Sequence, residues 1–416
     1  MKKIVSYLIS FLPWILPLYL VRFRIGPLPT TLLEVVLVLL FVSFTIAYGR
    51  KGWREGWKNL GSWQWPVIAW LVTTFAAIWW AADPLAGLGL WRAYILEPLL
   101  VFTILATVKD AGIVKRLQTN LCLVVMFLAG WAVVQFVTGW GIPHPWNVAI
   151  GDGRRATGPF PYPNALALFV VPIAAWALSR VSPPYEGGAR GGAARWLLVL
   201  TWCSALVATL LAKSDGGLIA LLSAAWLVLV LTKRTRLVTL VVTACLAVFV
   251  LSVPAVRTPI IKQVTFQEWS GQVRLFIWRE TWQMLKSRPI LGAGFGGYQE
   301  AFKPFHKATA IEIFQYPHQI VFNLWSETGL LGLFAFGWIV GMWGWYASRI
   351  THHASLGRSD DASRMLRVAC LAPLLAIVIH GLVDVPYFKN DLAIVFWMLV
   401  WMTVIVPRLD PKPSER

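Results

Sequence analysis

Twelve stretches of this sequence are apolar over about twenty residues each, the length that crosses the hydrocarbon core of a bilayer as a helix. The whole chain is 58% hydrophobic and 13% charged, whereas soluble domains are about a quarter charged. A chain of this composition cannot cover its surface with polar groups. We therefore predict an all-α membrane protein in which 1–416 form a single polytopic domain. The predicted transmembrane helices are 4–21, 31–48, 64–81, 89–107, 118–138, 161–179, 196–212, 216–232, 236–252, 329–348, 367–385 and 391–407.

The basic residues indicate membrane topology rather than a nucleic-acid partner. The net charge is +18, but Lys and Arg lie in the turns between the apolar stretches and not along one face. Placing the N-terminus in the cytoplasm puts 22 of the 37 Lys and Arg on the cytoplasmic side, as the positive-inside rule favours. Eight of the other 15 lie in the loop 253–317, to which the rule does not apply. We expect both termini in the cytoplasm and this loop outside it.

The loop 253–317 is the one connection large enough to form a subdomain. Within it, the segment VRLFIWRETWQMLKS spaces Val273, Phe276, Ile277, Trp282 and Leu285 close to a helical period. This spacing predicts one amphipathic helix that lies on the outer membrane face.

Gly292, Gly294 and Gly297 have the G-x-G-x-x-G spacing of dinucleotide-binding turns. That motif needs a strand before it, and here an expected helix precedes it, so we interpret the glycines as a tight turn leaving the amphipathic helix. The four cysteines lie within apolar stretches, and no His pair has the spacing of a zinc helix. We expect no cofactor and no metal.

His318 is the most informative polar residue of the chain. It begins a segment of about thirty residues that would extend roughly 45 Å as one helix, longer than the hydrocarbon core of about 30 Å. We therefore expect an extra helical turn at the outer face, broken near Gly329, with His318 at the mouth of a cavity. The pKa of an ordinary histidine lies close to neutral pH, so its uncharged imidazole can act as a general base.

Four motifs follow one another between 150 and 400. They are GRRATGPFPYPNALA, VRLFIWRETWQMLKSRPILGAGFGGYQEAF, a His-Gln pair at 318–319 with glycines at 329 and 332, and HGLVDVPYF. Together they resemble the O-antigen ligase and O-antigen polymerase superfamily of bacterial membrane proteins. The resemblance implies twelve helices with a long periplasmic loop before the third-last helix.

The resemblance also implies roles for particular residues. His318 would be the base that activates an acceptor hydroxyl, and Arg274 would contact a pyrophosphate. The family's Ser-Arg-Gly element falls at 214–216, where Asp215 replaces the arginine. The missing charge would come from Lys213 or from Arg154 and Arg155.

Further polar groups are expected around this site. Glu327 would orient His318 or cap the break before Gly329, and Gln319 follows the histidine. His380 and Asp384 are one helical turn apart and can hydrogen-bond near the same outer face. Glu97, within an apolar stretch, is expected to be functional or to pair with Arg92.

The resemblance implies a metal-independent glycosyltransferase in the bacterial inner (plasma) membrane. It would move an oligosaccharide from a polyprenyl-pyrophosphate carrier to a glycolipid, glycan or protein hydroxyl on the outer face, as in lipopolysaccharide or cell-surface polysaccharide assembly. Ligase, polymerase and protein O-oligosaccharyltransferase stay open as alternatives. So do a transporter like the proposed bicarbonate transporters and a scaffold for glycan assembly. Sugar, acceptor and oligomeric state are not indicated.

Overall fold

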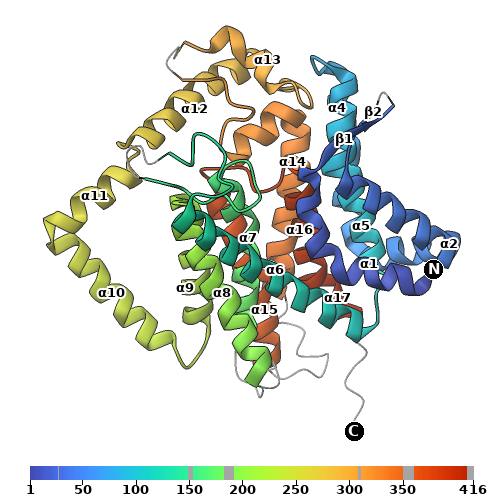
Figure 1. Ribbon diagram of the computed structural model, residues 1–416, viewed down its shortest axis with the longest axis horizontal. Helices are drawn as coiled ribbons and strands as arrows, with labels where there is room; N and C mark the ends of the chain where they lie inside the picture. The colour runs from blue at the N-terminus through green and yellow to red at the C-terminus, as the bar shows by residue number, and fades with distance from the viewer. Residues whose placement is uncertain (27, 149–152, 182–191, 308–310, 350–359, 410–416) are drawn as a thin grey trace.

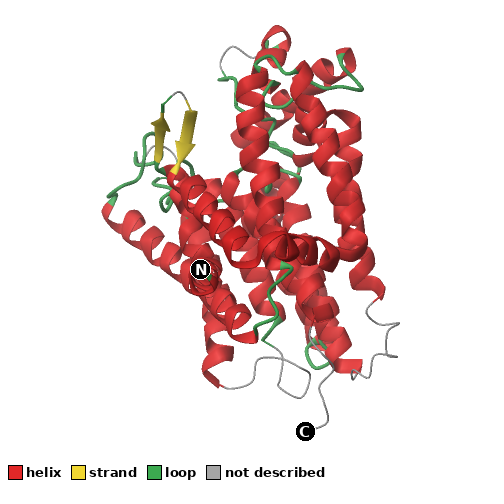
Figure 2. Ribbon diagram, turned by 90° about the vertical axis from the view of Figure 1, so that its right-hand side faces the viewer, coloured by secondary structure: helices red, strands yellow, loops and turns green. Residues whose placement is uncertain are grey.

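The computed structural model describes residues 1–26, 28–148, 153–181, 192–307, 311–349 and 360–409. It is a bundle of helices with one short antiparallel hairpin, β1 (Arg22–Ile25) and β2 (Leu28–Thr31), at one end (Figures 1 and 2). The same end carries α4, α12 and α13, and we call it the capped end (Figure 1).

The helices of the first half are α1 (Lys2–Ile15), η1 (Leu16–Leu20), α2 (Leu32–Leu60), η2 (Gly61–Trp63), α3 (Gln64–Ala76), η3 (Ala77–Trp80), α4 (Pro84–Trp91), η4 (Arg92–Leu96), α5 (Glu97–Leu105), α6 (Ala111–Thr138), α7 (Pro163–Ser179) and α8 (Gly192–Leu211). Those of the second half are α9 (Asp215–Leu231), α10 (Arg236–Ser252), α11 (Pro254–Val264), α12 (Trp269–Ser287), α13 (Tyr298–Phe302), η6 (Lys303–Phe305), α14 (Ile320–Arg349), α15 (Asp360–Gly381), α16 (Asn390–Val400), η9 (Trp401–Ile405) and α17 (Val406–Leu409).

Each of the twelve apolar stretches predicted from the sequence falls on helix. In the described part of the chain, seven helical segments are long and apolar enough to cross a membrane, or eight if the bent pair α10 and α11–α12 is one span. One of the seven, Leu32–Trp80, contains two predicted stretches. Three further apolar helices are shorter, namely Pro163–Ser179, Asp215–Leu231 and Asn390–Ile405. The multi-pass architecture is therefore present, and the count of twelve spans stays a prediction.

The interior of the bundle is built around α7 and α16. Both helices are apolar on every face and are buried along nearly their whole length, as expected of helices without a solvent-facing stripe. α7 packs against α8, α9, α15 and α16, while α16 packs also against α5. The N-terminal ends of these two helices, which lie toward the capped end, bring polar residues to the same region.

α10 and α11 leave the bundle as an arm (Figure 1). Neither helix has a buried residue, and the chain bends by 97° where α10 meets the α11–α12 segment. α12 then returns over the capped end. The segment 253–317 thus holds α11, α12, α13 and η6 rather than one helix, with residues 308–310 outside the described part.

α12 packs part of its apolar face on the protein and leaves another part exposed. Ile277 and Leu285 are buried as predicted, together with Met284 and Thr281. Phe276 and Trp282 are 39% and 41% exposed. Helical periodicity places the apolar residues of α12 on one broad side of the helix. The protein beneath α12 covers part of that side, including Ile277, Thr281 and Met284.

α14 is broken at Gly329, where φ is +67° and ψ is −176°. The break is held by the glycine-rich turn 292–297, because Ala293 donates to the Ser326 carbonyl at 2.6 Å and Leu330 donates to the Ile290 carbonyl at 2.9 Å. The Glu327 carboxylate accepts from the backbone N–H of Gly296. The turn follows a helix and its backbone is used within the protein, so it is a structural turn and not a dinucleotide site, as the sequence predicted.

Gly329→Ala should destabilise the protein, because a Cβ at Gly329 would lie 2.5 Å from the Ile290 carbonyl oxygen at a positive φ. We expect a loss of about 1–3 kcal/mol, seen as a lower melting temperature in detergent. Gly337→Ala, in the same helix with nothing near its Cβ position, is the matched control and should melt at or above the wild-type temperature. Equal melting of the two variants would contradict the role assigned to the break.

Candidate active site

His318 lies at the capped end, immediately before the break-bearing helix α14. Its φ is +51°, in the left-handed region that non-glycine residues seldom adopt. The segment is fixed from both sides: Trp278 of α12 donates its indole N–H to the Pro317 carbonyl at 2.9 Å, and Gln319 accepts from the Phe322 N–H at 2.7 Å. The surrounding structure thus enforces a backbone conformation that costs about 1–3 kcal/mol, as is common at active sites. Gln319 caps α14 and shows no side-chain contact with the imidazole among the described residues.

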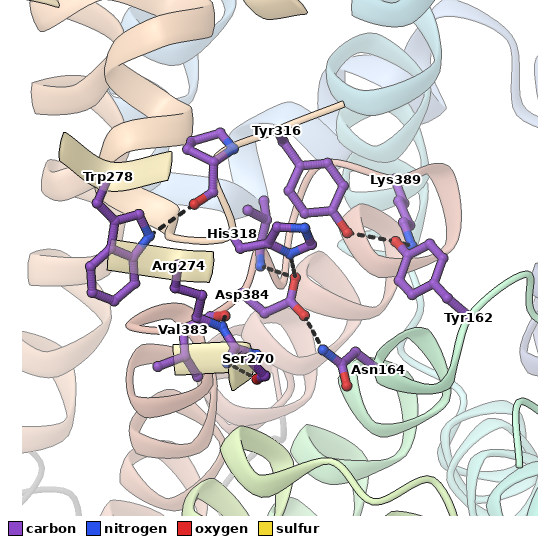
Figure 3. A network of polar contacts seen from close by, with 12 residues as sticks. Tyr162, Asn164, Ser270, Arg274, Trp278, Tyr316, His318, Val383, Asp384 and Lys389 are labelled. Atoms are coloured by element: carbon purple, nitrogen blue, oxygen red, sulfur yellow. Dashed lines mark hydrogen bonds and ion pairs between the residues drawn. The ribbon is translucent and has the colours of Figure 1, made fainter. Parts of the chain in front are cut away.

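The imidazole of His318 faces a buried carboxylate. His318 Nδ1 lies 3.6 Å from Asp384 Oδ1, and the two side chains are 20% and 1% exposed (Figure 3). Asp384 also accepts from Asn164 Nδ2 at 2.9 Å and from the Val385 N–H at 2.8 Å. Burial alone would raise the pKa of Asp384, but His318, His380 and the Val385 amide outweigh it and lower this pKa to about 2. Asp384 is therefore a fixed anion beside the imidazole.

Asn164 connects this pair to Arg155. The Arg155 Nη2 donates to Asn164 Oδ1 at 3.2 Å, so one amide side chain joins the guanidinium to the carboxylate. Arg155 also donates to the carbonyls of Ala212 and Lys213, at 3.0 and 3.1 Å. Its guanidinium stacks over the Trp146 ring, 5.0 Å from the centroid. These contacts hold the cation at one angle relative to Asp384.

The other two cations proposed from the sequence lie at the edge of this network. Arg154 donates from Nη1 to the Val137 carbonyl at 3.3 Å, at the end of α6. Lys213, with a φ of +49°, contributes its carbonyl to Arg155. Of the three candidate cations, Arg155 is the one that side-chain hydrogen bonds join to Asp384, through Asn164, in the described part of the chain.

Arg274 reaches the same site from α12. Its Nε donates to the Val383 carbonyl at 3.2 Å, one residue before Asp384, and its Nη1 donates to Ser270 Oγ at 2.7 Å (Figure 3). Arg279 is exposed and lies over the Phe276 ring, 6.0 Å from the centroid. The prediction that the two arginines occupy different faces of the helix, with Arg274 toward the site, agrees with this placement.

Asp215 stands at the first position of α9, where the family pattern has arginine. Its carboxylate hydrogen-bonds Gln263 of α11 and lies within electrostatic range of Arg155 and Arg274. The residue that departs from the pattern is therefore an acidic group within electrostatic range of both guanidiniums.

Three other predicted groups have partners that the sequence did not name. His380 is buried, and its ring packs against Gly216 of α9. The Asp384 N–H donates to the His380 carbonyl at 3.0 Å. Among the described residues the two side chains share no hydrogen bond, because the Asp384 carboxylate faces His318 and Asn164 instead. Glu327 binds the glycine-rich turn rather than the imidazole. The expected pairing of Arg92 with Glu97 is present at 3.4 Å, and Arg92 also lies 2.8 Å from Glu34.

Two tyrosines and a lysine complete the site and were not found from the sequence. The Tyr316 ring lies 4.7 Å from the His318 ring, and its hydroxyl shares a 2.8 Å hydrogen bond with the Tyr162 hydroxyl. Lys389 Nζ donates to the Tyr162 hydroxyl. Burial lowers the pKa of Lys389 to about 8. The only sequence signal was that Tyr162 lies in the PYPN segment, two residues before Asn164.

Comparison with known families agrees with the motifs. The family model described as O-antigen ligase matches residues 199–337, which include Arg274, His318 and the glycine-rich turn. Asn164 and Asp384 lie outside the matched residues. No curated protein matches the chain. Over residues 199–337, about a third of its length, this chain is similar to the O-antigen ligase family.

Proposed function

We propose that this chain transfers a glycan from a polyprenyl-pyrophosphate carrier to an acceptor hydroxyl, with His318 as the general base. The observation that carries the proposal is the pairing of His318 with buried Asp384. That pair lies in one polar network with the guanidiniums of Arg155 and Arg274. The match of residues 199–337 to the O-antigen ligase family supports a glycosyltransferase-like enzyme of the ligase or polymerase type.

Asp384 would act as a positioning residue for the imidazole. An ionised carboxylate beside Nδ1 favours the tautomer with the proton on Nδ1 and leaves the lone pair of Nε2 to accept a proton. The 3.6 Å separation is longer than a hydrogen bond. Such contacts often tighten only when substrate binds.

The reaction would run as follows at this site. The acceptor oxygen forms a bond to the anomeric carbon of the glycan, and the bond from that carbon to the pyrophosphate oxygen breaks. The hydroxyl proton moves to His318 Nε2, and the bonding electron pair leaves with the pyrophosphate. Arg274 and Arg155 would stabilise this developing negative charge, since guanidinium groups bind phosphate oxygens in a fork.

The capped end would face away from the cytoplasm. The distribution of Lys and Arg supports this orientation, and a lipid-linked glycan with its acceptor would then meet at the outer face, beside loop 253–317. Both termini would be cytoplasmic.

His318→Ala should abolish transfer, because the attacking hydroxyl loses its base. We expect release of polyprenyl pyrophosphate to slow by about 10²–10⁴-fold, measured on purified protein with a lipid-linked oligosaccharide, an acceptor panel and EDTA. His144→Gln, at an exposed histidine, should keep wild-type activity. Full activity of His318→Ala at normal protein level would overturn the proposal, and solute counterflow without any donor would favour the transporter.

Asp384→Asn should lower kcat by about 10²–10⁴-fold while the donor KM changes little, because an amide cannot hold the imidazolium that forms. Asp384→Glu restores the charge and should recover part of kcat. The control is Asp83→Asn, which keeps the cap of α4. A rise in KM at constant kcat would show that Asp384 serves binding and not the base.

The orientation can be tested by cysteine labelling in a background without the four native cysteines. Gln299→Cys, exposed at the capped end, should react with an impermeant maleimide in intact cells. Arg54→Cys, at an exposed residue expected on the cytoplasmic side, should react only after permeabilisation. The reverse pattern would invert the proposed topology.

A further inference from the structure

Next to His318 lies a second polar cluster that the proposed chemistry does not use. It comprises Tyr19 at the end of α1–η1, Tyr162, and the consecutive residues Lys389, Asn390 and Asp391 at the start of α16. Tyr19 and Asp391 are 5% and 1% exposed, and Asn390 is buried as well. We call these five residues the α16 cluster.

Three polar atoms of the cluster lack a hydrogen-bond partner in the described part of the chain. They are the Tyr19 hydroxyl, Asn390 Nδ2 and Asp391 Oδ1. Each buried polar atom without a partner lowers the stability of the folded protein. Native proteins keep few of them, and a group of three in one place indicates that something else completes their bonding.

The cluster is continuous with the candidate active site. Lys389 bonds the Tyr162 hydroxyl, Tyr162 bonds Tyr316, and the Tyr316 ring contacts the His318 ring. Asp391 lies within electrostatic range of Tyr19, Tyr94 and Lys389. Figure 3 places Lys389 and Tyr162 on one side of the His318–Asp384 pair, and Arg274 with Ser270 on the other.

The two sides differ in the charge that they can accept. The side of Arg274 presents a guanidinium and suits an anion. The α16 cluster presents one ammonium and one carboxylate, and Arg22 lies within electrostatic range of Tyr19 and Lys389. A cation would therefore meet Lys389 and Arg22, and an anion would meet Asp391. A neutral ligand with several hydroxyls can donate to Asp391 Oδ1 and accept from Asn390 Nδ2, since each hydroxyl does both. The tyrosine rings offer apolar faces beside these polar groups, as in ligand sites with few convergent polar atoms.

We propose that the α16 cluster binds the acceptor as a neutral saccharide and presents its attacking hydroxyl to His318. This inference rests on the proposed transfer and names the acceptor side of the same site. The donor pyrophosphate would lie across the imidazole, beside the arginines. The two substrates would thus approach the base from opposite sides, and the acceptor would need no charge of its own.

Binding without donor tests the subsite separately from the transfer reaction. Purified full-length protein in nanodiscs would be applied to an array of neutral oligosaccharides of hexose and N-acetylhexosamine units, with Ser/Thr-rich peptides as a second set. Wild type should bind at least one neutral oligosaccharide and no peptide. Asp391→Asn and Tyr19→Phe should each weaken this binding by about tenfold or more, the loss expected for a hydrogen bond to a charged or buried group.

Matched controls separate binding from folding. Tyr19→Phe removes only a hydroxyl without a partner, so the melting temperature should stay at or above wild type while affinity falls. Tyr298→Phe removes a buried hydroxyl that bonds Thr281, and Asp110→Asn keeps the cap of α6. Both should bind like wild type. Binding of peptides instead of saccharides, binding of neither, or unchanged affinity in Asp391→Asn would each overturn the inference. If the protein binds a saccharide but shows no transfer, the inferred subsite would stand and the proposed reaction would be refuted.

Discussion

The candidate site depends on the burial of one carboxylate, Asp384, between segments that are far apart in the sequence. A buried anion costs several kcal/mol unless hydrogen bonds and a nearby positive or polarisable group satisfy it. Asn164 at the start of α7, the Val385 amide and His318 before α14 supply those contacts. Removing any one of these partners leaves the buried Asp384 carboxylate with too few hydrogen bonds to stabilise its charge. The carboxylate therefore fixes where α7, α14 and the α15–α16 connection meet.

The glycine-rich turn and the break in α14 serve the same placement. A straight α14 would carry its N-terminal turn away from the bundle end, and the break at Gly329 redirects that turn. Two backbone hydrogen bonds hold the break. Ala293 in the turn donates to the Ser326 carbonyl, and Leu330 donates to the carbonyl of Ile290, just before the turn. α12 then crosses above, where Trp278 holds Pro317 and Arg274 reaches Val383. His318 is thus held by α12 and α14 together, and Asp384 by the bundle below.

The sequence was sufficient wherever the controlling physics is local. The length of each apolar stretch located the helices, the excess length before Gly329 predicted the break, and the short separation of Arg92 and Glu97 predicted their contact. It failed where a contact joins distant segments. Asp384 was expected to bond His380, four residues away, and instead faces His318 and Asn164.

The departure of Asp215 from the family pattern has a physical reading in this arrangement. A third guanidinium at the start of α9 would concentrate positive charge near Arg155 and Arg274, and each would repel the others in the absence of an anion. A carboxylate there lies in range of both and reduces that repulsion. The same carboxylate weakens the local attraction for a pyrophosphate, so donor affinity in this chain would rest on two arginines with fixed geometry rather than on a larger net charge. Selectivity then falls to the other side of His318, where paired opposite charges and unsatisfied hydrogen-bonding atoms favour a neutral ligand over a charged one.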